Sequence, residues 1–142
     1  MDLPHLSLIK VDENPLCFGC GKANPHGLKM KFDRNSKTAR AEFIPTEYHQ
    51  GWPGHVHGGA LTAAIDEAIG WATFLNNIYA VTAKLDVRFK SMARVGETLI
   101  VTANITKEAT RILEIEAQVK REDGTIVAEA SSLQFVVQTR SP

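Results

Sequence analysis

The sequence predicts an α+β domain in which a curved antiparallel sheet wraps around one long central helix. One segment, from Gly58 to about Leu75, carries apolar residues at helical spacing and is the only convincing helix in the sequence. Four segments that follow it alternate apolar and polar residues, as half-buried strands do. A sheet of such strands buries its apolar face when it packs on the helix. The 142 residues are expected to form a single domain, 1–142, with a real core.

The remaining elements follow in chain order. Residues 1–26 are rich in proline and glycine, which indicates loops. Two strands, Leu28 to Phe32 and Thr38 to Phe43, are expected to form a hairpin that turns at residues 33–36. An irregular loop over residues 44–56 leads into the helix. Four strands are expected after the helix, over residues 81–90, Thr98 to Thr106, Arg111 to Lys120 and Thr125 to Val137.

The run His57-Gly58-Gly59 at the start of the helix is the first candidate for chemistry. Glycines let a backbone approach a ligand, and a helix N-terminus offers N–H groups to a developing negative charge. Asp66 lies further along the helix among alanines and isoleucines, poor company for a carboxylate without a task. Together these features suggest hydrolysis of an activated acyl group. The alternative is a plain tight turn followed by an ordinary solvated acid.

The spacing of Gly58 and Asp66 has a consequence for assembly. At about 1.5 Å per residue, the two lie roughly 12 Å apart along one helix. One small reacting group cannot touch both within a single chain. If both act on the same carbonyl, a second copy of the chain supplies one of them, and the site spans a homodimer interface.

Two cysteines, Cys17 and Cys20, stand in a loop-like Cys-x-x-Cys run. Such a pair can be half of a zinc site, a redox couple or two structural thiols. A zinc site needs two more ligands, for which His5 and His26 are the nearest histidines in the sequence. Structural thiols that pack or cap the loop are the favoured interpretation.

Composition limits the range of partners. Basic and acidic residues number 16 each, which argues against nucleic acid as a main partner. No apolar run reaches membrane-spanning length, and Met1 to Lys10 lacks the pattern of a signal peptide. A cytoplasmic location without a membrane partner is therefore expected by default.

Three stretches of the sequence resemble the hotdog-fold thioesterases, and in particular the phenylacetate-pathway (PaaI-like) acyl-CoA thioesterases. They are residues 17–28, with the Cys-Phe-Gly-Cys-Gly and Asn-Pro-His-Gly-Leu runs, residues 50–59, with the His-Gly-Gly run, and residues 61–70, with Asp66 and Glu67. The resemblance implies a hotdog fold, hydrolysis of a medium-chain or aromatic acyl-CoA, no cofactor, and a homodimer or homotetramer (a dimer of dimers).

The resemblance also implies roles for individual residues. Gly58 would donate its backbone N–H to the thioester carbonyl, and Asp66 of the opposing subunit would act as general base or nucleophile. Thr82 matches the hydroxyl that related enzymes place near the attacking water, although strand alternation is equally consistent with a surface hydroxyl. His57 would help to shape the site, and Gly59 would lie against the substrate.

Other matches are weaker. Several relatives carry an amide side chain where this sequence has Gly51, so Gln50 is the candidate to hold the thioester instead. Glu67 is a reserve for Asp66. Arg88 and Lys90 are candidates for the coenzyme A phosphates, or else belong to a solvated sheet face. Residues 49–57 hold three histidines in no clear ligand geometry, so a metal-free site is expected.

Two other functions are compatible with such a fold. Dehydration or hydration of acyl-CoA would need a histidine later on the helix, and none stands between Asp66 and Leu75. A non-catalytic acyl-CoA-binding protein has no need of an acid beside the thioester. Asp66 therefore favours the hydrolase.

Overall fold

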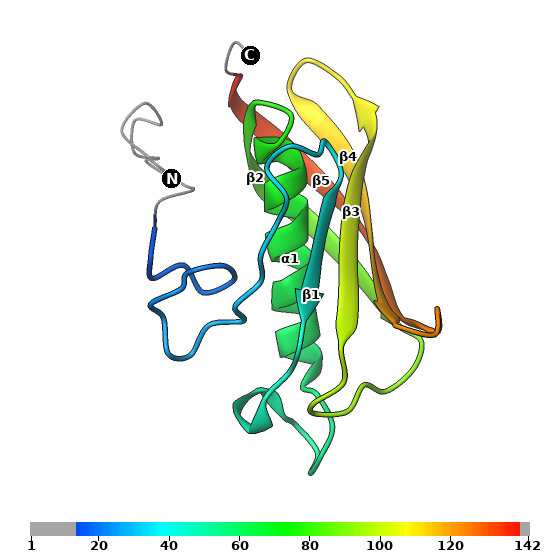
Figure 1. The fold of residues 1–142 in the computed structure, drawn as a ribbon. Coiled ribbons are helices and arrows are strands. Elements are labelled where there is room, and N and C mark those ends of the chain that lie inside the picture. Colours follow the sequence, from blue (N-terminus) through cyan, green and yellow to red (C-terminus); the bar gives the residue numbers. More distant parts are fainter. Residues whose placement is uncertain (1–13, 140–142) are drawn as a thin grey trace.

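The computed structural model describes residues 14–139, which form one layer of sheet and one long helix (Figure 1). The expectations on Met1 to Lys10 and on His5 lie outside these residues. The elements are β1 (Ala39–Phe43), the short 3-10 helix η3 (Glu47–His49), α1 (Gly58–Phe74), β2 (Ile78–Phe89), β3 (Leu99–Glu108), β4 (Ile112–Arg121) and β5 (Ile126–Thr139). The expected α+β class is confirmed.

The strands form one antiparallel sheet in the order β1-β3-β4-β5-β2. Helix α1 lies against one face of this sheet, as Figure 1 shows, and it contacts all five strands. The core fills the space between them, with Phe43, Ile65 and Leu99 fully buried. Of the described residues, no helix combines the length and the apolar character that a bilayer-spanning helix requires.

Small residues let α1 lie close to the sheet. Its buried positions include Ala64, Ala68 and Ala72, which recur every fourth residue along one face. Ile65 and Ile69 extend the same face, so a narrow apolar stripe of the helix packs against the sheet. The opposite side of the helix carries Asp66, which is exposed in the single chain.

The expected strand Leu28 to Phe32 is wrong as a strand but right as a pattern of burial. Leu28 and Met30 are buried, while Lys29 and Lys31 between and after them are exposed. The backbone N–H groups of Leu28 and Met30 donate to carbonyls of the loop that contains Cys17 and Cys20, which we call the cysteine loop. They do not pair with a strand. Strand β1 pairs with β3 instead, so the hairpin expected from local alternation does not form.

Strand β2 is a twelve-residue edge strand, hydrogen-bonded to β5 on one side, with no other strand of the described residues on its second side. Its register against β5 shifts between Thr82 and Lys84. Such a bulge inserts one extra residue and reverses which side chains face the helix. Long unpaired edges are uncommon in soluble proteins because they invite pairing with another chain.

Candidate active site

The start of α1 presents one backbone N–H that is not used inside the fold. His57 caps the helix, and its Nδ1 accepts from the Gly59 N–H at 2.8 Å. The His57 carbonyl accepts from the N–H groups of Ala60 and Leu61. Among residues 14–139 the Gly58 N–H has no acceptor. It is therefore available to an external oxygen, at the positive end of the helix.

Of the two glycines in this turn, Gly58 and Gly59, only Gly59 is required by the space around it. A Cβ on Gly59 would lie 2.9 Å from Nδ1 of His57, so the histidine cap requires a glycine there. A Cβ on Gly58 would meet only the Phe89 ring, at 3.4 Å, which is ordinary contact. Phe89 ends β2, is 53% exposed and lies beside Gly58. Reasoning from the sequence placed Phe89 in a strand but not at the site.

Asp66 and Thr82 are brought together from different elements. The hydroxyl of Thr82 donates to Oδ1 of Asp66 at 2.9 Å. Regular alternation along β2 would put Thr82 on the same face as Lys84 and Asp86. The register shift after Thr82 turns it toward α1 instead, together with Leu85. The sequence alone left this placement open, because a bulge has no signature in simple alternation.

Behind Thr82 lie two buried polar side chains, Ser132 and Gln134, that the sequence pattern did not predict as part of the site. Gln134 is 1% exposed, and its Nε2 donates to Oγ1 of Thr82 and to Oγ of Ser132, both at 3.0 Å. A chain of hydrogen bonds therefore runs from β5 through Thr82 to the Asp66 carboxylate. The available signal was that Ser132 and Gln134 continue the inward-facing series of Ala128 and Ala130, where apolar residues are expected.

Gln50 and Gly51 belong to the loop that leads into the helix. The side-chain carbonyl of Gln50 accepts from the Gly54 N–H at 2.8 Å, so this group is engaged within its own loop. A Cβ on Gly51 would lie 3.2 Å from Cδ2 of His57. Gly51 thus leaves room for the ring that caps α1, which is a structural reason for a glycine at this position.

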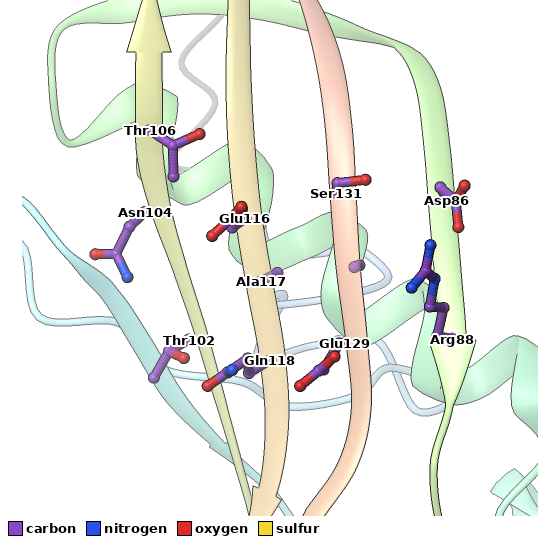
Figure 2. A pocket seen from close by; sticks show the side chains of 11 residues that line it. Asp86, Arg88, Thr102, Asn104, Thr106, Glu116, Ala117, Gln118, Glu129 and Ser131 are labelled. Atoms are coloured by element: carbon purple, nitrogen blue, oxygen red, sulfur yellow. The ribbon is translucent and has the colours of Figure 1, made fainter.

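Arg88 does not lie with the other candidates in the single chain. Figure 2 shows Arg88 beside Asp86 on the face of the sheet that α1 does not cover. Polar side chains from four strands line a hollow of about 570 Å³ there, Glu116 and Glu129 among them. Lys90 is exposed just beyond the end of β2, with its backbone N–H bonded to Val127. A phosphate-binding role for Arg88 and Lys90 stays a prediction.

Glu67, the reserve acid, points to different partners from Asp66. Its Oε1 accepts from the Trp71 indole N–H at 3.1 Å and from the Cys17 thiol at 3.6 Å. Burial, together with hydrogen bonds to Glu67 and Cys17, raises the pKa of the Cys20 thiol far above its usual range. Glu67 is thus held by the cysteine loop, while Asp66 is held by β2.

Comparison with solved structures identifies the fold class. A hypothetical thioesterase protein from Streptococcus pneumoniae, solved with coenzyme A, aligns with a TM-score of 0.74 at 15% identity, covering 79% of this chain and 91% of that chain. The Escherichia coli PaaI protein from the phenylacetic acid degradation operon aligns with a TM-score of 0.74 at 20% identity, covering 84% and 85%. A Streptococcus mutans protein bound to acetyl CoA aligns with a TM-score of 0.72 at 20% identity, covering 97% and 100%. The fold is the hotdog fold of the thioesterases.

Sequence comparison then gives the family. The model of the thioesterase superfamily matches residues 53–128, more than half of the chain, so the chain belongs to that superfamily. Human acyl-coenzyme A thioesterase THEM5 is 29% identical over 114 residues, covering 78% of this chain and 46% of that protein. Mouse acyl-coenzyme A thioesterase THEM4 is 28% identical over 114 residues, covering 80% and 49%. The chain spans about half the length of these curated relatives.

Proposed function

We propose that this protein hydrolyses the thioester of an acyl-CoA to a carboxylic acid and free coenzyme A. The observation that carries the proposal is that α1 presents both an exposed Asp66, held by Thr82, and a Gly58 N–H that has no acceptor among residues 14–139. Membership of the thioesterase superfamily and the names of the curated relatives support this assignment.

The proposed chemistry divides the work between these groups. The Gly58 N–H binds the thioester carbonyl oxygen and stabilises the negative charge that develops on it. Asp66 accepts a proton from water, the resulting hydroxide attacks the carbonyl carbon, and the carbon–sulfur bond breaks to release the coenzyme A thiolate. A direct attack by the Asp66 carboxylate is the alternative route, with water then cleaving the anhydride. No cofactor or metal takes part in either route.

Thr82 has a positioning role in this scheme. Its hydroxyl donates to Oδ1 of Asp66 and accepts from Gln134, so its orientation is set from the buried side. The second oxygen of the carboxylate is left for the water. Crystal structures of the Streptococcus pneumoniae relative include an aspartate-to-alanine and a threonine-to-alanine variant, at positions sixteen apart. Asp66 and Thr82 have the same separation in this chain.

The proposed site is completed by a second copy of the chain. Gly58 and Asp66 are the first and ninth residues of α1, roughly 12 Å apart at the helical rise, so they do not share one carbonyl. Antiparallel pairing of two β2 edges about a twofold axis would set the Thr82 end of one strand beside the Phe89 end of the other. Because Phe89 lies against Gly58, this pairing brings Asp66 near Gly58 of the partner subunit. Dimers of this kind can pair again into tetramers.

The acyl group is proposed to be medium-chain or aromatic. Exposed apolar side chains stand near the start of α1, with Phe89 beside Gly58 and Trp52 in the preceding loop 77% exposed. Such side chains offer an apolar surface to the acyl chain.

The other parts of the substrate have their own proposed contacts. Arg88 and Lys90 are proposed to contact the coenzyme A phosphates, and Gln50 and Gly59 are proposed to lie beside the thioester group.

The test is free-thiol release from short, medium, long-chain and aromatic acyl-CoAs by wild type and by Asp66→Asn. We expect turnover by wild type, and a loss of about 100-fold or more in the variant, the scale of a lost acid or base. Binding of acyl-CoA without turnover by either protein would replace the proposal with a non-catalytic binding function. Equal turnover by both proteins would exclude Asp66 as the base.

A further inference from the structure

The Cys-x-x-Cys loop and α1 bring three metal-ligand atoms together. The two sulfur atoms of Cys17 and Cys20 are 3.2 Å apart, and the Cys17 sulfur is 3.6 Å from Oε1 of Glu67. All three donor atoms lie within 4.8 Å of one another. In a tetrahedral zinc site, two thiolates at about 2.3 Å from the metal lie ~3.8 Å apart, so a small widening of the sulfur pair admits the ion.

The backbone of the loop is shaped around these donors. A Cβ on Gly19 would lie 2.2 Å from Cδ of Glu67, so only a glycine lets the carboxylate approach here. A Cβ on Gly21 would lie 2.4 Å from the Cys17 nitrogen, so the turn also needs its second glycine. The Cys20 N–H points at the Cys17 sulfur, at 3.4 Å, and the Gly21 N–H donates to the Cys17 carbonyl. The result is a tight turn in the cysteine loop, with both sulfur atoms on the same side of the turn.

The backbone of the cysteine loop is anchored to the core. The carbonyls of Phe18 and Gly19 accept from the N–H groups of Leu28 and Met30, two residues buried against the sheet. The carboxylate of Glu67 accepts a hydrogen bond from the Trp71 indole N–H. The Trp71 ring in turn stacks on Phe32, with ring centroids 5.0 Å apart. The loop backbone and the Glu67 carboxylate are therefore both held by contacts outside the cluster, as outer contacts orient the ligands of a metal site.

We propose that Cys17, Cys20 and Glu67 bind one zinc ion that ties the cysteine loop to helix α1. Two sulfur donors favour zinc over magnesium or calcium, which prefer oxygen. On binding, the ion replaces the two thiol protons, which pass to solvent, and both thiolates and the carboxylate become ligands. A water takes the fourth position, because both cysteines are partly exposed. The cluster occupies the turn of α1 that also carries Asp66, so the ion would hold that turn in place.

The experiment uses Co²⁺ alone and then Zn²⁺ as probes on the reduced, chelator-treated protein, and it needs no activity measurement. We expect one Co²⁺ per chain, with the near-ultraviolet absorption of thiolate-to-cobalt charge transfer, which Zn²⁺ then abolishes. Cys17→Ser and Cys20→Ser should lose this absorption. The Glu67→Gln variant should bind Co²⁺ at least about tenfold more weakly than wild type. Loss of a residue that only orients a metal ligand already lowers metal affinity by about that factor.

Asp66→Asn is the matched control, because it neutralises the neighbouring carboxylate and should leave Co²⁺ binding unchanged. Zn²⁺ should also raise the thermal midpoint of wild type and of Asp66→Asn, and not that of Cys20→Ser. Absence of the charge-transfer band in folded, reduced wild type would overturn the proposal without any variant. The proposal would also be overturned if Cys17 and Cys20 form a disulfide and its reduction restores no metal binding. Failure of the thioesterase proposal would leave this result unaffected.

Discussion

Thr82 donates a hydrogen bond of 2.9 Å to Asp66 from a strand whose regular alternation would turn the threonine away from the helix. The register shift between Thr82 and Lys84 reverses the facing of the strand at that point. Bulges of this kind re-aim single side chains next to functional sites. The contact links α1, β2 and, through Gln134, the interior of β5.

Replacing Thr82 by valine removes the hydroxyl and keeps the shape. We expect kcat for acyl-CoA hydrolysis to fall about 10- to 100-fold, the scale of a lost hydrogen bond to a charged group, with little change in KM. Thr82→Ser keeps the hydroxyl and should retain most of the activity. Steady-state kinetics on the best substrate of the panel make the comparison. A Thr82→Val enzyme as fast as Thr82→Ser would remove Thr82 from the mechanism.

Replacing Gln134 by leucine tests the buried end of the same chain of hydrogen bonds. The change leaves the hydroxyls of Thr82 and Ser132 without the Nε2 donor, and we expect a loss of about 1–3 kcal/mol in the free energy of unfolding. Gln138→Leu makes the same substitution at an exposed position of β5 and should change stability far less. Urea denaturation measures both. Equal losses would show that the buried network does not stabilise the fold.

Replacing Gly58 by proline removes the candidate N–H with little cost to the helix. Gly58 is the first residue of α1, a position that favours proline, and His57 has φ −63° and ψ 135°, which suit a residue before proline. We expect kcat to fall about 10²- to 10³-fold, as for the loss of one oxyanion donor. Gly58→Ala keeps the N–H and places a Cβ in ordinary contact with Phe89. It should lose much less activity than the proline variant.

Circular dichroism would show that both Gly58 variants keep the helix. If Gly58→Pro and Gly58→Ala lose activity equally while folded, the backbone N–H is not the group that binds the carbonyl.

A mixed dimer tests whether the site spans two chains. Gly58→Pro and Asp66→Asn chains, co-expressed with different affinity tags and purified as a heterodimer, contain one site with both groups intact. We expect about half of the wild-type activity per dimer, although each homodimer is nearly inactive. A heterodimer as inactive as its parents would place both groups of each site in the same chain. Analytical ultracentrifugation of wild type should show a dimer or a larger even-numbered assembly.

Periodicity accounts for the parts of the fold that could be predicted. The helix was expected from Gly58 to about Leu75 and runs from Gly58 to Phe74, because alanine and isoleucine recur at helical spacing over that whole stretch. The four strands after it lie where alternation placed them, within a few residues at each end. The segment Leu28 to Phe32 alternates equally well but pairs with the cysteine loop. Alternation reports which side chains are buried, and it does not report the partner of the backbone.

The amino-acid sequence by itself determined the fold class, the long helix and the placement of Gly58 and Asp66 on it, because these depend on local periodicity and spacing. The partners of the side chains were decided by the tertiary structure. The bulge in β2 turns Thr82 to Asp66, the inward face of β5 supplies Gln134, and the cysteine loop folds onto Glu67 of the helix. These contacts join residues far apart in the chain, and their geometry follows from how the sheet, the loop and the helix pack together.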